Sequence, residues 1–197
     1  MRKTKRKIRP PPRAATAPPS PRPGRPVTIH HAYPGLRLDR RAIARAIHTL
    51  DTHLAAFSLQ PAALRPFGHE LSLAFLTDTA LARLHADFLD DPTPTDVITF
   101  AGDPAHGLAG EICLSVDAAL RQPGAAPVTG DKLSTELTLY LVHGWLHLAG
   151  HDDLAPGPKR RMRAAEARAM RLLRDTDTLP RFTLGSREGK RRAGGGF

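Results

Sequence analysis

The segment from Lys132 to Leu148 constrains this 197-residue chain most, because it is long, strongly apolar and must be buried. Its length and aliphatic character predict a largely buried helix. It is still too short and too polar for a membrane span, since the chain has no apolar run of about 18 residues or more. Apolar residues make up 41% of the chain, which is enough for one core. We therefore expect this helix at the centre of a single domain.

Shorter patterns on both sides of this helix indicate alternating strands and helices. Period-two or β-branched runs predict strands at 27–31, 70–76, 97–100 and 111–116. Helical spacing or turn and cap signals predict the remaining helices at 39–57, 78–89, 117–121 and 158–173. The fold class is therefore α/β (α+β): a single domain with about four strands in a mixed sheet, about five helices and the long apolar helix at its centre.

Positive charge is concentrated at the two ends of the chain. The chain carries 29 Lys+Arg against 19 Asp+Glu, a net charge of +10. Residues 1–26 contain nine Lys/Arg, eight prolines and no acid, which predicts a disordered basic tail. Residues 179–197 are expected to form a second basic, Gly-rich tail, and residues 27–178 the domain. Basic tails on a nearly neutral domain favour a polyanion such as RNA as partner, although solubilising extensions explain them equally well.

Two histidines in the apolar helix predict a metal site. His143 and His147 are four residues apart, so a helix projects both imidazoles from one face, as chelation of one metal ion requires. Gly150 can end the helix in a left-handed conformation. The chain then turns back, so that Asp153 or His151 supplies a third ligand. Three protein ligands and one open position are typical of catalytic zinc, and one Zn²⁺ per chain is expected.

Two other residues within predicted elements bear on the site and on the class of protein. Glu136 shares a helical face with the two histidines, where it could orient His143; a solvated carboxylate is the alternative. Cys113 is the chain's one cysteine, which excludes an intrachain disulfide and a Cys-rich zinc module. Because it lies in an apolar run, it is expected to be an inert core residue.

Three segments of the chain carry recognisable motifs. They are HGWLHLAGHDD at residues 143–153, PTDVITF at residues 94–100 and GEICLS at residues 110–115. They resemble the signature H-G-x-L-H-L-x-G-Y-D-H, the P-T-D-V-L-S-F block and the G-D-I strand of the YbeY family, the metal-dependent endoribonucleases of bacterial ribosomal RNA maturation. The resemblance covers roughly residues 27–175 and implies the family's fold and activity.

The resemblance also assigns ligands. The family's first two zinc ligands fall on His143 and His147, and its third ligand, normally histidine, falls on Asp153. A carboxylate oxygen binds zinc at nearly the distance of an imidazole nitrogen, so the site is retained with one more negative charge. His151 stands where the family usually has tyrosine and is the alternative third ligand.

Further family positions concern the RNA cleft. An arginine that many members place before the P-T-D block, implicated in RNA handling, falls on Leu89. Thr95 and Asp96 are candidates to line the cleft, although they could instead stabilise a turn. The substitution at Leu89 weakens the expected phosphate contact without affecting the expected fold.

The resemblance implies a zinc-dependent, single-strand-specific endoribonuclease that processes ribosomal RNA at the 16S 3′ end and takes part in ribosome quality control. Its implied partners are ribosomal RNA and the small ribosomal subunit, in the cytoplasm, because neither a membrane span nor a secretory signal is recognisable. The alternative is a noncatalytic, zinc-stabilised ribosome-associated RNA-binding factor. A metalloprotease is disfavoured because Gly144 stands where such enzymes place a glutamate general base.

Overall fold

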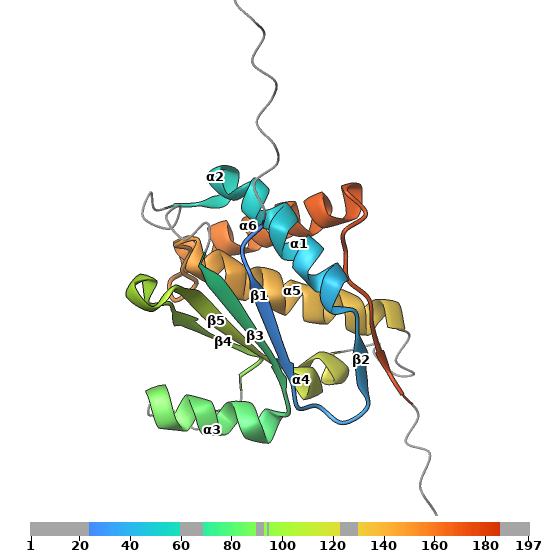
Figure 1. Cartoon of the computed structure of the whole chain (residues 1–197). Helices are drawn as coiled ribbons and strands as arrows, with labels where there is room; N and C mark the ends of the chain where they lie inside the picture. Colours follow the sequence, from blue (N-terminus) through green and yellow to red (C-terminus); the bar gives the residue numbers. More distant parts are fainter. Residues whose placement is uncertain (1–23, 60–68, 90–92, 94, 123–129, 186–197) are drawn as a thin grey trace, which may run out of the picture.

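A four-stranded mixed sheet forms the centre of the molecule (Figure 1). The structure is a computed structural model that describes residues 24–59, 69–89, 93, 95–122 and 130–185. In spatial order the strands are β1 (Val27–His31), β3 (Glu70–Leu76), β5 (Leu108–Ser115) and β4 (Val97–Ala101). The first three are parallel and β4 is antiparallel to β5. The predicted mixed sheet is confirmed.

Helices cover both faces of this sheet (Figure 1). They are α1 (Arg40–Thr52), α2 (Leu54–Phe57), α3 (Asp78–Leu89), α4 (Val116–Arg121), α5 (Gly130–Leu148) and α6 (Pro156–Asp175), with a 3₁₀ turn η2 (Pro104–His106). The helix predicted over 39–57 is interrupted at His53, so the described part has six α-helices where about five were expected. None of the helices in these described segments is long and apolar enough to cross a membrane.

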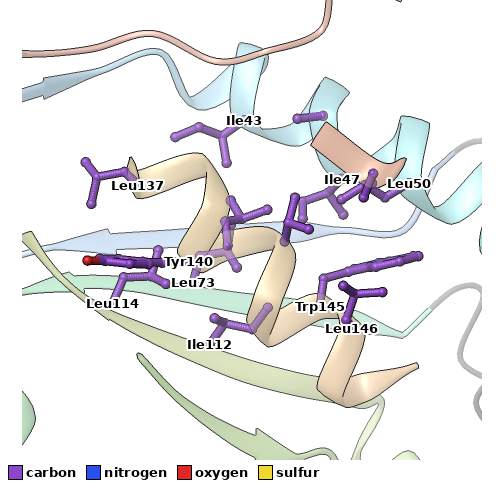
Figure 2. Packing of buried hydrophobic residues seen from close by; sticks show 14 of the residues in the cluster. Ile43, Ile47, Leu50, Leu73, Ile112, Leu114, Leu137, Tyr140, Trp145 and Leu146 are labelled. Carbon is purple, nitrogen blue, oxygen red and sulfur yellow. The ribbon is translucent and has the colours of Figure 1, made fainter. Parts of the chain in front are cut away.

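The long apolar helix α5 lies at the centre of the main core, as the sequence predicts (Figure 2). Alternate residues of the strands face opposite sides of the sheet. Leu73 of β3 and Ile112 of β5 pack in the main core with α1, α5 and α6. Ala74 and Cys113 point to the other side, where they pack with Leu81 of α3. Cys113 is buried, and this burial raises its thiol pKa to about 12, so the inert role expected for it is consistent with its surroundings.

A glycine lets α5 approach the sheet closely. A Cβ atom placed on Gly144 would lie 2.5 Å from Cγ2 of Ile112 and 3.0 Å from Oγ1 of Thr99. Any side chain here would therefore push the helix away from β5. This close contact fixes the distance of His143 and His147 from the sheet, because they lie one position before and three positions after Gly144 on the same helix.

A buried carboxylate ties α5 to α1 and to the segment before β1. Asp51 is 4% exposed; it accepts a hydrogen bond from Trp145 Nε1 at 3.0 Å and another from Arg25 Nε at 2.6 Å. Next to Arg25, the carbonyl of Pro26 accepts a hydrogen bond from the backbone N–H of Leu71 at 3.0 Å. The predicted tail over residues 1–26 is thus wrong at its end, because Arg25 and Pro26 belong to the folded body. Residues 1–23 lie outside the described part.

The chain after α6 also belongs to the fold. Strand β6 (Phe182–Leu184) pairs antiparallel with β2 (Leu36–Leu38). The Phe182 ring is fully buried 5.4 Å from the Phe75 ring, and its backbone N–H donates to Ser134 Oγ at 2.9 Å. The prediction that a tail begins at residue 179 is therefore wrong, since the described fold continues to Gly185. Strands of three residues are too short to show a period-two pattern.

Replacing Phe182 with alanine tests the contribution of β6. We expect Phe182→Ala to lower the free energy of unfolding by about 3–5 kcal/mol, because the change leaves a cavity in the main core. The neighbouring Thr183 is exposed, so Thr183→Ala should change it by less than about 1 kcal/mol. Urea denaturation of both variants measures the difference. Equal effects would show that residues 179–185 do not contribute to the core.

Candidate metal centre

Three side chains at the end of α5 converge on one point. Nε2 of His143 lies 2.9 Å from Nε2 of His147. Oδ2 of Asp153 lies 3.8 Å from the first nitrogen, and its Oδ1 lies 3.9 Å from the second. One ligand atom from each residue lies within 4.8 Å of the others. The structure therefore brings together the three residues that the sequence singled out as metal ligands.

The turn after α5 carries Asp153 back to the histidines. Gly150 adopts φ 94°, the left-handed conformation that the sequence predicts for it. Its N–H donates to the carbonyl of His147 at 2.9 Å, and the N–H of His151 donates to the carbonyl of Leu146 at 3.0 Å. These two bonds form the Schellman motif that closes a helix and reverses the chain. The reversal is what places a residue six positions after His147 beside it.

The outer nitrogen of each histidine is held by an acceptor. Nδ1 of His143 lies 2.6 Å from Oε1 of Glu166 on α6, and Nδ1 of His147 lies 3.1 Å from the carbonyl of His151. A carbonyl or carboxylate oxygen can only accept, so both Nδ1 atoms donate. A neutral imidazole that donates from Nδ1 carries a lone pair on Nε2. Both inner nitrogens therefore present lone pairs to the same point.

This arrangement fits a metal ion. Two lone pairs 2.9 Å apart, with a carboxylate beside them, repel one another unless a proton or a cation lies between them. A proton satisfies only one pair of atoms, whereas a metal ion accepts all three donors. Two imidazole nitrogens and one carboxylate oxygen are ligands that suit zinc, and three protein ligands leave a position open. The side chains are 20%, 28% and 33% exposed, so this position is accessible.

The surroundings shift the pKa values of the two histidines in opposite directions. Burial disfavours the charged form of His143, but the Glu166 carboxylate, with smaller contributions from Asp153 and Asp96, outweighs it and raises the pKa above the usual value. Burial and the neighbouring His143 lower the pKa of His147, against smaller opposing contributions. His147 is therefore the histidine whose neutral, metal-binding form is favoured at neutral pH.

Two expected site residues lie elsewhere. The His151 side chain is buried and its Nε2 donates to the carbonyl of Phe57 at 2.8 Å, so it faces α2 and contributes only its backbone carbonyl to the site. Glu136 lies about two turns before His143 on α5, and Glu166 occupies the orienting position expected for it. Glu166 lies on α6, 23 residues after His143 in the sequence. One sequence signal was available, since it is the one acidic residue between Lys159 and Arg174 in a basic helix.

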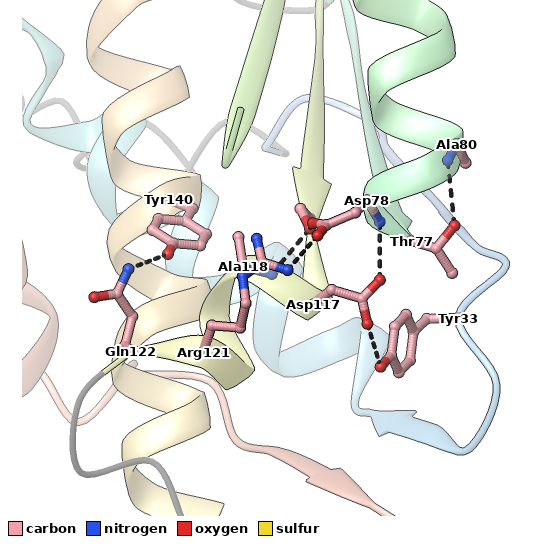
Figure 3. Close-up of polar contacts among 10 residues, drawn as sticks. Tyr33, Thr77, Asp78, Ala80, Asp117, Ala118, Arg121, Gln122 and Tyr140 are labelled. Atoms are coloured by element: carbon pink, nitrogen blue, oxygen red, sulfur yellow. Dashed lines mark hydrogen bonds and ion pairs between the residues drawn. The ribbon is translucent and has the colours of Figure 1, made fainter. Parts of the chain in front are cut away.

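Thr95 and Asp96, the two cleft candidates, line a cavity of about 340 Å³. Ala118, Arg121, Gln122 and Tyr140 complete its lining. Figure 3 shows Gln122 donating to the Tyr140 hydroxyl at 3.1 Å and Arg121 paired with Asp78.

Leu89 is the last residue of α3, and residues 90–92, which follow it, lie outside the described part.

Comparisons with known proteins agree with the motifs. The family model described as "Endoribonuclease YbeY" matches residues 37–174. Relatives with that name are 38% identical in Chlamydia pneumoniae (56% of this chain, 73% of the relative) and 34% identical in Streptomyces griseus (68% and 81%). A solved Thermotoga maritima structure is similar at a TM-score of 0.46 and 17% identity, over 84% of this chain and 99% of that one.

Removing the Glu166 carboxylate should weaken metal binding without removing a ligand. We expect Glu166→Gln to lower zinc affinity about 10–100-fold, because the His143 ring loses the partner that fixes its orientation and raises its basicity. Glu136→Gln is the matched control and should leave the affinity unchanged. Competition with a fluorescent chelator measures both. Equal losses would mean that the His143–Glu166 contact does not support the site.

Proposed function

The chain belongs to the YbeY endoribonuclease family, and we propose that it is a zinc-dependent endoribonuclease that cleaves single-stranded RNA. The observation that carries the proposal is the convergence of His143 Nε2, His147 Nε2 and the Asp153 carboxylate at an accessible point. The names of the relatives support RNA as substrate and endonucleolytic cleavage as the reaction. The proposed substrate is ribosomal RNA, with the 16S 3′ end as the processing site.

His143, His147 and Asp153 would hold the zinc ion, one per chain. When bound, the ion supplies Lewis acidity toward a phosphate oxygen and lowers the pKa of a coordinated water. Glu166 and the His151 carbonyl fix the two imidazoles with their Nε2 atoms directed inward. The carboxylate of Asp153 adds a negative charge that a histidine there would not, which makes the site less attractive to an RNA phosphate.

The cavity lined by Thr95 and Asp96 is the proposed entry for RNA. Asp96 is exposed at its wall and contributes to the raised pKa of His143, which supports an approach from this cavity to the metal centre. Thr95 lies on the same wall, with its hydroxyl 3.3 Å from the carbonyl of Val97. We propose that the strand reaches the site along this wall.

Two other functions are less well supported. A metalloprotease needs a general base after the first histidine, and Gly144 leaves no room for one because a Cβ there would meet Ile112 at 2.5 Å. A noncatalytic, zinc-stabilised RNA-binding factor is the second candidate, favoured by leucine at position 89, where the family resemblance implies an arginine. Either RNA role fits a protein that acts on the small ribosomal subunit in the cytoplasm and contributes to ribosome quality control.

Ligand substitutions test the proposed reaction. We expect His147→Ala to lose bound zinc and to reduce cleavage of a labelled single-stranded RNA more than about 100-fold. This loss is larger than the roughly 10–100-fold expected when only a residue that orients a ligand is removed. His106→Ala, at an 82% exposed side chain, is the matched control and should cleave normally. Asp153→His should retain zinc and cleave at least as well as the natural protein, because a neutral ligand leaves more positive charge on the metal.

A chelator, zinc readdition and a double-stranded RNA of the same sequence complete the experiment. Cleavage should stop with the chelator, return with zinc and be much weaker on the duplex. If the natural protein holds one zinc per chain and cleaves no RNA while Asp153→His also fails, the noncatalytic factor is the better description. Cleavage that the chelator leaves intact would contradict the metal-dependent reaction.

A further inference from the structure

The positive charge of the described protein is concentrated in α6. This helix carries seven Lys/Arg and only two carboxylates, Glu166 and Asp175. Outside α6, the described residues hold nine Lys/Arg against fourteen Asp/Glu. A folded body that is otherwise acidic thus presents one strongly basic helix, which lies beside α5 and packs against it.

Four arginines of α6 form one solvent-facing stripe, the α6 arginine face. The buried side of the helix is defined by Met162, Ala165, Ala169, Met170 and Leu173. All six arginines of α6 are exposed. Arg161 and Arg168 lie toward one side of the helix, and at 3.6 residues per turn the other four fall within an arc of about 80°. They are Arg160, Arg163, Arg171 and Arg174. At 1.5 Å rise per residue, the face is about 21 Å long.

Nothing inside the described molecule neutralises this face. Within the described ranges, no ion pair joins any of the four arginines to a carboxylate. Glu166, the acid in the middle of the helix, is committed to His143 at 2.6 Å. Like charges three or four residues apart on a helix destabilise it. A polyanion or counterions from solution would relieve this repulsion.

The face runs past the metal centre, because Glu166 lies between Arg163 and Arg171 along α6. Arg163 lies one turn before Glu166, and about 60° around the helix from it. The carboxylate of Glu166 in turn contacts the His143 ring. A strand bound along the α6 arginine face would therefore pass beside the metal site and continue toward the end of α6 at Asp175.

We propose that the α6 arginine face binds the phosphate backbone of the RNA strand that continues beyond the cleavage site. This inference rests on the proposed RNA substrate. Guanidinium groups hold phosphates through paired hydrogen bonds, and a row of them contacts successive phosphates without reading base sequence. The face thus supplies affinity and fixes the direction of the strand, while the metal centre supplies the chemistry.

Neutralising the face in the full-length protein tests the proposal. The variant R160Q/R163Q/R171Q/R174Q keeps residues of similar helix propensity. The control R37Q/R41Q/R83Q/R181Q removes the same net charge from exposed arginines outside α6. Affinity for a labelled single-stranded RNA oligonucleotide is measured over a range of salt concentrations. We expect at least a tenfold loss for the α6 variant, and a slope of log K against log salt reduced by about 0.7 for each lost phosphate contact.

Two further measurements keep the outcome decisive. The double variant R171Q/R174Q changes only the end of the face remote from Glu166, so zinc content should be unchanged while the salt slope falls by about half as much. Binding to vesicles containing phosphatidylserine is compared in parallel. Equal losses for the α6 and control variants, or an α6 variant that loses vesicle binding and keeps its RNA slope, would overturn the proposal.

Binding and cleavage separate this proposal from the proposed function. If the natural protein binds RNA through α6 and cleaves none, the α6 arginine face stands and the nuclease fails. If it cleaves RNA and the α6 variant keeps both affinity and salt slope, the nuclease stands and the face fails.

Discussion

The site depends on one constraint, the pairing of each histidine's outer nitrogen with an acceptor. Nδ1 of His143 donates to Glu166 and Nδ1 of His147 donates to the carbonyl of His151, so both Nε2 lone pairs of the neutral imidazoles face the same point. The Asp153 carboxylate adds a third electron-rich group. A cation resolves this repulsion for all three donors at once, and this requirement connects the fold to a metal-dependent reaction.

The rest of the structure holds that pairing in place. Gly144 seats α5 directly on β5, and the Asp51–Trp145 hydrogen bond ties the same turn of α5 to α1. The Schellman turn at Gly150 supplies both Asp153 and the His151 carbonyl. Helix α6 contributes Glu166 on its inner side and arginines on its outer side. One helix thus orients a ligand and, in our proposal, guides the substrate.

Local patterns in the sequence predicted much of the site but little of its support. The i,i+4 histidines, the glycine turn and Asp153 lie within eleven residues, so helix geometry alone relates them. The strand at 70–76 was equally visible because its residue types alternate with period two. Glu166, Arg25 and Phe182 were missed because their partners lie 23, 26 and 48 residues away in the chain, and no spacing rule relates such positions. Family resemblance supplied the substrate class, which geometry alone does not specify.

Anomalous diffraction at the zinc edge, from crystals of the full-length protein grown with zinc, tests the central claim most directly. We expect one peak per chain, about 2.0–2.2 Å from Nε2 of His143, Nε2 of His147 and a carboxylate oxygen of Asp153. The Nδ1 contacts to Glu166 and to the His151 carbonyl should be retained. A peak coordinated by the His151 side chain, or no peak between His143 and His147 in crystals that contain zinc elsewhere, would contradict it.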